Sequence, residues 1–150
     1  MPGALRRSTM NAVLTNEVTQ DMEVVATSFF FPRGLLGFEH VKKYSLTSKE
    51  SEAPFSRLRM EEGNGLTLLV MPIMSLFPDY SPGLAREDME MLQIQDASEL
   101  LMFHVVNLKK GLRPTVNLKG PILLNTRTGV GAQVVITNAA DYSTKETLPL

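Results

Sequence analysis

The chain has 150 residues, of which 43% are hydrophobic and 21% charged, a composition typical of one globular domain. Its 15 basic and 16 acidic residues give a net charge of −1, so no overall positive charge attracts it to nucleic acid. The sequence has no cysteine, which excludes disulfides, thiolate metal sites and cysteine nucleophiles and fits the cytoplasm.

The N-terminal residues show no periodicity. Residues 1–10 are predicted to form a flexible leader, and residues 11–150 a single domain. No apolar stretch near the N-terminus is long enough for the core of a signal peptide. The most apolar segment, residues 66–77, contains Pro72 and is much shorter than the roughly 20 residues of a membrane-spanning helix. We therefore expect a cytoplasmic protein without a membrane segment.

Short runs of Val, Ile, Leu, Thr and Phe, separated by Gly, Pro, Asn and Ser, recur from residue 11 onward. This pattern is typical of a β-rich domain. The predicted strands span residues 11–18, 24–31, 44–47, 56–60, 66–71, 100–108, 114–118, 122–125 and 132–137. The run at 100–106 is apolar at nearly every position, so both of its faces should be covered. We predict a mainly β fold, either a compact antiparallel β-barrel or a barrel-like sandwich.

Only one segment has helical spacing. Ala85, Met89 and Leu92 lie on one face of a helix near residues 85–92. The solvent-facing side is predicted to carry Arg86, Glu87, Asp88 and Glu90.

Two glycines, Gly129 and Gly131, have a spacing that occurs in dinucleotide-binding loops. Such a loop needs a helix after it, whereas residues 133–137 have the β-branched pattern of a strand. The sequence therefore predicts a glycine-rich hairpin turn between residues 125 and 133.

The two histidines, His40 and His104, have no nearby acidic residues at metal-ligand spacing, so we expect no metal and no cofactor. His104 lies in an apolar run and is predicted to be a buried, hydrogen-bonded imidazole, while His40 is expected at a turn. One alternative stays open, a small β-barrel enzyme or ligand carrier that uses His104 or Asp79 in an interior cavity. Direct RNA binding is disfavoured, because the aromatic run 29–31 has only Arg33 nearby.

The segment Phe77-Pro78-Asp79-Tyr80 places two aromatic residues around Pro-Asp, directly after an apolar strand. Proline and aspartate favour a fixed turn, and such a turn can present aromatic rings at an edge, where they contact a partner. A buried corner with the same residues is an equally good interpretation of the sequence.

Two further segments are rich in glycine and proline. In Phe31-Pro32-Arg33-Gly34-Leu35-Leu36-Gly37-Phe38-Glu39, the glycines permit backbone angles closed to other residues, so that Phe38 can fold back into the core. The other is Pro114-Thr115-Val116-Asn117-Leu118, followed by Gly120-Pro121-Ile122 and later by Asn125, Gly131, Gln133 and Tyr142. In this order, from about residue 22 to Leu148, the motifs resemble the FliW family of flagellar assembly factors. The first segment is similar to that family's Phe-Pro-Lys-Gly-Leu-Pro-Gly-Phe-Glu signature, with Leu36 in place of proline, and the second resembles its Thr-Ala-Asn-Leu-x-Ala-Pro-Ile.

The resemblance implies a non-catalytic partner switch. Members of that family bind the translational regulator CsrA and prevent it from repressing flagellin messenger RNA, and they also bind flagellin. Free flagellin then titrates the factor away from CsrA, and flagellin synthesis falls. The partner-contact residues that combine turn-edge chemistry with family motifs are Phe77, Asp79, Tyr80, Asn117 and Leu118.

Overall fold

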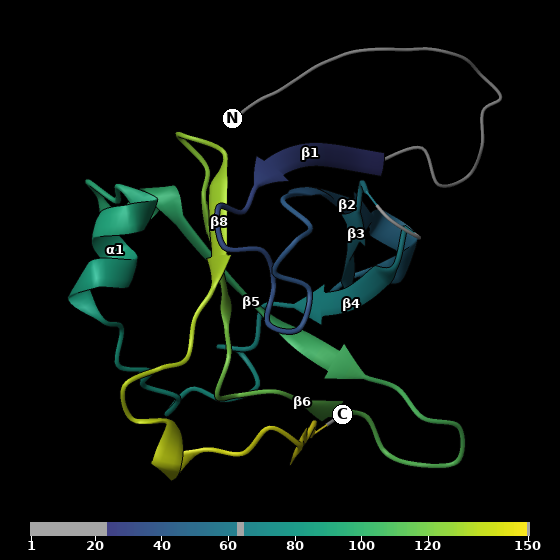
Figure 1. Ribbon diagram of the computed structural model, residues 1–150. Coiled ribbons are helices and arrows are strands. Elements are labelled where there is room, and N and C mark those ends of the chain that lie inside the picture. Colours follow the sequence, from purple (N-terminus) through teal and green to yellow (C-terminus); the bar gives the residue numbers. More distant parts are fainter. Residues whose placement is uncertain (1–23, 63–64, 150) are drawn as a thin grey trace, which may run out of the picture.

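The computed structural model describes residues 24–62 and 65–149. Three predictions concern residues outside these ranges: the leader, the strand at residues 11–18, and the absence of a signal peptide. The described chain is mainly β with one α-helix, as predicted (Figure 1). The strands are β1 (Val24–Phe30), β2 (Lys43–Lys49), β3 (Ser56–Met60), β4 (Thr67–Met71), β5 (Leu100–Asn107), β6 (Thr115–Val116), β7 (Ile122–Asn125), β8 (Val130–Gln133) and β9 (Glu146–Thr147). The helices are α1 (Arg86–Leu92) and the 3-10 turns η1 (Glu50–Glu52), η2 (Ala97–Glu99) and η3 (Ala139–Asp141).

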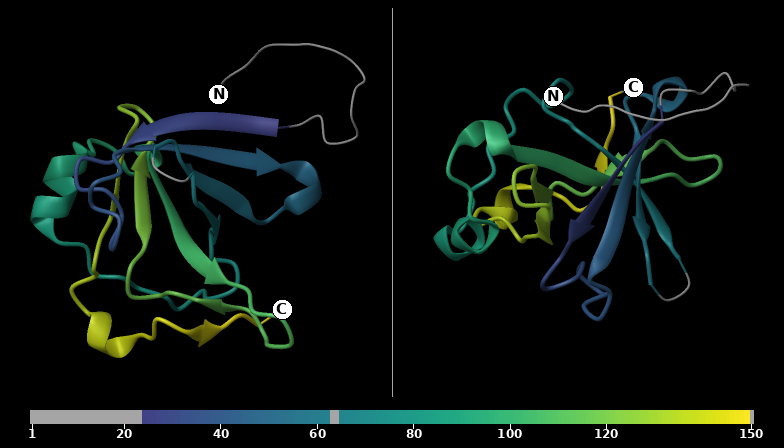
Figure 2. Two further views of the ribbon diagram at one scale, coloured as in Figure 1. Left: turned by 45° about the vertical axis from the view of Figure 1, so that its right-hand side comes forward. Right: turned by 90° about the horizontal axis from the view of Figure 1, so that it is seen from above.

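Seven of the strands form a closed barrel. Their order is β4-β3-β2-β1-β8-β7-β5, and pairing of β5 with β4 completes the ring. This confirms the predicted barrel. All neighbours in the ring are antiparallel except β1 and β8, which are parallel and meet through one register pair, Phe30 with Val130. Strands β6 and β9 extend the sheet from the end of β5, which places the C-terminal segment beside the barrel (Figures 1 and 2).

Alternation of side chains sets the register of the meander from β1 to β4. In β3, Ser56, Leu58 and Met60 are buried, while Arg57 and Arg59 are exposed. Because successive side chains of a strand point to opposite faces, this pattern fixes which face of β3 lines the barrel.

The hairpin prediction at residues 125–133 is confirmed, since β7 and β8 pair antiparallel on either side of a tight turn. Gly129 adopts φ +75° in that turn. Gly131 follows in β8, where a Cβ atom would lie 2.6 Å from Cε1 of Phe31. A glycine is therefore required at residue 131 to let the Phe31 ring fill the barrel interior.

The barrel core gathers buried aliphatic and aromatic side chains around Phe31 and Tyr44, whose ring centroids are 4.7 Å apart. The loop after β1 closes one end of this core. Gly34 and Gly37 have φ of +67° and +89°, and the half-buried Phe38 packs against the core, as the sequence predicts. His40 lies exposed in a turn of the same loop.

Several predicted boundaries differ from the structure. The strand predicted at 132–137 begins at Val130 and ends at Gln133, and the strand predicted at 114–118 comprises only Thr115 and Val116. The amides of residues 134 and 136 still donate to the carbonyls of Pro121 and Lys119 in the β7–β8 register. The ladder ends there because Pro121 has no N–H to return a bond and the Lys119 amide donates to Asn117 instead. Among the described residues, no helix has the length and apolar character that a membrane crossing requires.

Candidate partner-binding surface

A segment that we call the strap, residues 72–85, connects β4 to α1 along the side of the barrel. Within it, the Tyr80 amide donates to the Phe77 carbonyl at 3.0 Å, which closes a turn over Pro78 and Asp79. Phe77 is half-buried, Asp79 is exposed and Tyr80 is buried. The predicted turn is present, and it combines both interpretations of the sequence: its rim is exposed and its last residue forms a buried corner.

The strap forms one wall of a hollow of about 440 Å³, which we call the acidic hollow. Four of the five predicted contact residues line it: Phe77, Asp79, Tyr80 and Leu118. The hollow is completed by Leu76, Pro78, Asp141, Tyr142 and Glu146. The fifth predicted residue, Asn117, is not part of this lining. Its amide oxygen accepts from the amides of Lys119 and Gly120 at 2.9 and 3.2 Å and holds the turn after β6.

Three rings run from the core to the acidic hollow. Tyr80 meets His104 edge to face at a centroid distance of 5.1 Å and Tyr142 at 4.9 Å. The Tyr80 hydroxyl donates to the carbonyl of Leu118 at 2.7 Å and lies 3.0 Å from Nε2 of His104. A hydroxyl has one proton to donate, so Nε2 of His104 must carry the proton that Tyr80 accepts.

This arrangement fixes His104 as a neutral ring. The side chain is fully buried, and Nδ1 has no hydrogen-bond partner among the described residues. Burial lowers the pKa of His104 to about 4 and raises the pKa of Tyr80 to about 12, with Tyr142 adding to the Tyr80 shift. The prediction of a buried, hydrogen-bonded imidazole is confirmed.

The alternative function requires an imidazole or carboxylate that faces an interior cavity. His104 is enclosed and its Nε2 is occupied by Tyr80, whereas Asp79 lies on the exposed rim of the acidic hollow. His104 and Asp79 therefore do not face a shared interior cavity. Within residues 24–62 and 65–149, no cluster of three or more His, Asp or Glu side chains could hold a metal ion.

Charge distinguishes the acidic hollow from an ordinary apolar groove. Asp79, Asp141 and Glu146 lie around its rim, and no lysine or arginine lines it. None of the three belongs to an ion pair found within the described part of the chain. With the rings of Phe77 and Tyr142 beside them, these carboxylates suit a basic side chain, which an aromatic face also attracts.

Sequence reasoning missed Asp141, Tyr142 and Glu146 as members of this surface. Tyr142 fits a family motif, but no local pattern links it to the strap 61 residues earlier, where its hydroxyl accepts the amide proton of Ser81 at 2.9 Å. The link comes from the β6–β9 pairing, which returns the C-terminal segment to the strap.

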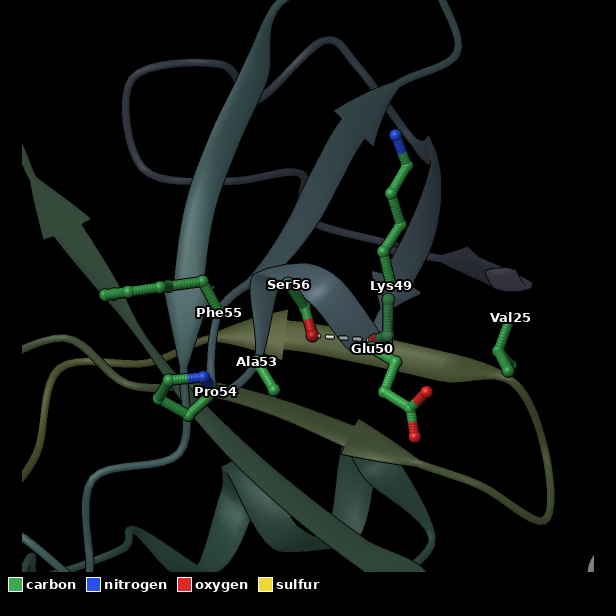
Figure 3. A pocket seen from close by; sticks show the side chains of 8 residues that line it. Val25, Lys49, Glu50, Ala53, Pro54, Phe55 and Ser56 are labelled. Atoms are coloured by element: carbon green, nitrogen blue, oxygen red, sulfur yellow. Dashed lines mark hydrogen bonds between the residues drawn. The ribbon is translucent and has the colours of Figure 1, made fainter. Parts of the chain in front are cut away.

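A second hollow, of about 230 Å³, lies at the mouth of the barrel (Figure 3). Val25, Ser48 and Ser56 form one cross-strand row beneath it, and Ala53, Pro54 and Phe55 form its rim. The two serine hydroxyls bond to each other at 2.7 Å. Because each hydroxyl already has a partner, this hollow offers a ligand little beyond apolar contact.

Several motif residues fasten the frame rather than face the acidic hollow. Arg33 in the loop after β1 donates to Asp88 in α1 at 2.9 Å, and this pairing overturns the prediction that Asp88 faces solvent, since it is 7% exposed. The buried Asn125 donates to the Leu92 carbonyl at 2.7 Å and so satisfies the end of α1. The side-chain oxygen of Gln133 accepts from the Leu36 amide at 3.0 Å.

Comparison with known proteins identifies the family. The family model of the FliW protein matches residues 11–148. The flagellar assembly factor FliW of Thermotoga neapolitana is 36% identical over 134 residues, which cover 88% of this chain and 86% of the relative. FliW of Clostridium botulinum is 31% identical over 119 residues, covering 79% and 84%. A crystal structure of the flagellar assembly factor FliW matches with a TM-score of 0.75 and 26% identity, over 90% of this chain and 92% of that one. This chain therefore belongs to the FliW family of flagellar assembly factors.

Proposed function

We propose that this protein is a non-catalytic, cytoplasmic flagellar assembly factor that binds a CsrA-type translational regulator and flagellin. Bound to the regulator, it prevents repression of flagellin messenger RNA. Free flagellin draws the factor away, and the released regulator lowers flagellin synthesis. Such a switch needs complementary surfaces and no reacting groups, and membership of the FliW family is the observation that carries the proposal.

The acidic hollow is the surface that we propose for one of these partners. Phe77 and Asp79 are the contact residues, because both line the hollow and remain open to solvent at the strap turn. Tyr80 and Leu118 are 5% and 3% exposed, so they act mainly as its floor. Asn117 contributes by holding the turn beside Leu118. A partner segment with a basic side chain next to an apolar one fits this lining.

Calorimetry tests the switch directly. The purified protein is titrated with CsrA, with flagellin, and with each partner in the presence of the other. We expect binding of both proteins and a weaker affinity for each when the other is present. The two coupling factors must be equal, because thermodynamic linkage is reciprocal. Failure to bind either partner, or binding of both without mutual weakening, would contradict the proposal.

A pair of matched variants tests the surface. The double substitution Asp79→Asn and Asp141→Asn removes two rim charges with little change of shape. We expect it to lower the affinity for one of the two partners about tenfold. The control Glu50→Gln and Glu87→Gln removes two exposed carboxylates elsewhere and should leave both affinities unchanged. Equal effects of the two double variants would show that net charge, rather than this hollow, governs binding.

A further inference from the structure

A third hollow, of about 210 Å³, lies where the loop after β5 meets the β6–β9 extension, and we call it the basic hollow. Its lining consists of Asn107, Lys109, Leu112, Arg113, Thr115 and Lys145. Half of these side chains are cationic and none is acidic. The loop projects from the barrel between β5 and β6 in Figure 1, so its side chains can approach a partner without displacing the barrel.

The acidic and basic hollows lie close together on either side of the β6–β9 extension. Thr115 pairs with Thr147, and Val116 pairs with Glu146. Lys145, in the turn before β9, lines the basic hollow, while Glu146, the first residue of β9, lines the acidic hollow. The extension therefore separates two surfaces of opposite charge.

The cations of the basic hollow are not neutralised within the described part of the chain. The ion pairs found there use Arg33, Arg57 and Arg127. Arg113 donates one N–H to the Leu148 carbonyl at 3.2 Å, which leaves most of its guanidinium donors available. Three positive charges that have no ion pair among residues 24–62 and 65–149 surround this small hollow and favour an anionic group.

Exposed leucine side chains beside these charges favour a peptide over nucleic acid as the partner. Leu112 is 68% exposed and lines the hollow, and Leu108 in the same loop is 58% exposed. Nucleic acid fits less well, because no aromatic side chain lines the hollow to stack on a base and the net charge of the chain is −1. A carboxylate followed by an aliphatic side chain would match both the cations and the leucine.

We propose that the basic hollow is a second docking surface, and that it takes an acidic peptide segment of a protein partner. A carboxylate lies between the Arg113 guanidinium and the ammonium groups of Lys109 and Lys145, and a neighbouring aliphatic side chain covers Leu112. The basic hollow shares no lining residue with the acidic hollow. The test of this proposal is therefore independent of the test of the acidic hollow.

The test uses the full chain labelled with nitrogen-15 and a blocked peptide of alternating aspartate and leucine as the probe. We expect the peptide to shift the amide resonances of residues 107–115 and 145, with a Kd of about 1 mM for so short a ligand. The Lys145→Gln variant should weaken this binding about tenfold, and so should Arg113→Gln. The matched control, Arg59→Gln, removes an exposed arginine from β3 and should bind the peptide normally.

Three further probes separate the sources of the anionic group. A peptide with asparagine in place of aspartate should cause no shift at the basic hollow. Inorganic phosphate and a short uridine oligonucleotide should bind at least tenfold more weakly than the acidic peptide. Equal or tighter binding of phosphate or RNA, or normal binding of the acidic peptide to Lys145→Gln, would overturn the proposal.

Discussion

The barrel interior and the strap are held together in different ways. In the barrel, backbone ladders join the strands, and an apolar core around Phe31 fills the space inside. The strap makes no ladder, and its apolar side chains pack in a separate core cluster that includes Ile73. Polar side chains add single bonds: Tyr80 to the Leu118 carbonyl, Tyr142 to the Ser81 amide, and Asn138 to both the Gly83 amide and the Ser81 carbonyl. A substitution in the barrel should therefore cost stability according to the volume it removes. In the strap, one lost side chain can release the wall of the acidic hollow.

The largest effect is expected in the barrel interior. Phe31→Ala should lower the free energy of unfolding by about 3–5 kcal/mol, because it removes a fully buried ring and leaves a cavity. Urea denaturation followed by circular dichroism measures this loss. The control Phe30→Ala removes the neighbouring ring, which is 48% exposed, and should cost about 1 kcal/mol or less. Equal losses in the two variants would break the distinction between core and surface on which the comparison depends.

The next effect concerns the histidine beneath the strap. The pKa of His104 is about 4 in the folded protein and 6.5 when unperturbed, so between these values the unfolded state binds more protons. The free energy of unfolding should therefore fall as the pH drops from about 6.5 to about 4, by about 3 kcal/mol in total. Denaturation at a series of pH values measures the slope.

His104→Phe should remove this dependence and leave the Tyr80 hydroxyl bonded to Leu118. The control His40→Asn, in an exposed turn, should retain it. Hydrogen bonds lower the pKa values of the carboxylates Glu39, Glu52, Asp96 and Glu99. Their contribution to stability is therefore lost only at lower pH, and it is common to both variants. An unchanged slope in His104→Phe would contradict the assignment of a neutral, buried ring.

The smallest expected effect is the release of the strap. Asn138→Ala removes an acceptor 2.7 Å from the Gly83 amide and a donor 2.9 Å from the Ser81 carbonyl. We expect a loss of about 1–2 kcal/mol, because the part-buried Gly83 amide is left unpaired. Amide exchange within residues 77–83 should increase more than exchange in β2 and β3. Uniform acceleration across the chain would mean that strap and barrel open as one unit.

The sequence predicts best what depends on neighbouring residues. The strands at 56–60 and 122–125 have the predicted bounds, because the alternation of the first and the aliphatic run of the second are local properties of the sequence. The turn glycines Gly34 and Gly37 were predictable for the same reason, since their role depends on the adjacent backbone.

Features that depend on residues far apart in the sequence could not be predicted in this way. Asp88 is buried because Arg33, 55 residues earlier, reaches it, and nothing in the helical pattern indicates that contact. Strand β9 has two residues, Glu146 and Thr147, which is too short for a recognisable alternation. Glu146 reaches the acidic hollow through this strand, so four contact residues could be predicted while two of the three rim carboxylates could not.

The parallel contact between β1 and β8 has a mechanical consequence. Strands β1 and β8 meet at one register pair, whereas β1 and β2 share seven. The β1–β8 contact is therefore the weakest closure of the barrel. Fluctuations that break the fewest hydrogen bonds therefore part the ring at Phe30 and Val130. We expect the strands from β1 to β4 to separate as one unit that stays connected to the rest of the barrel through the β4–β5 pairing.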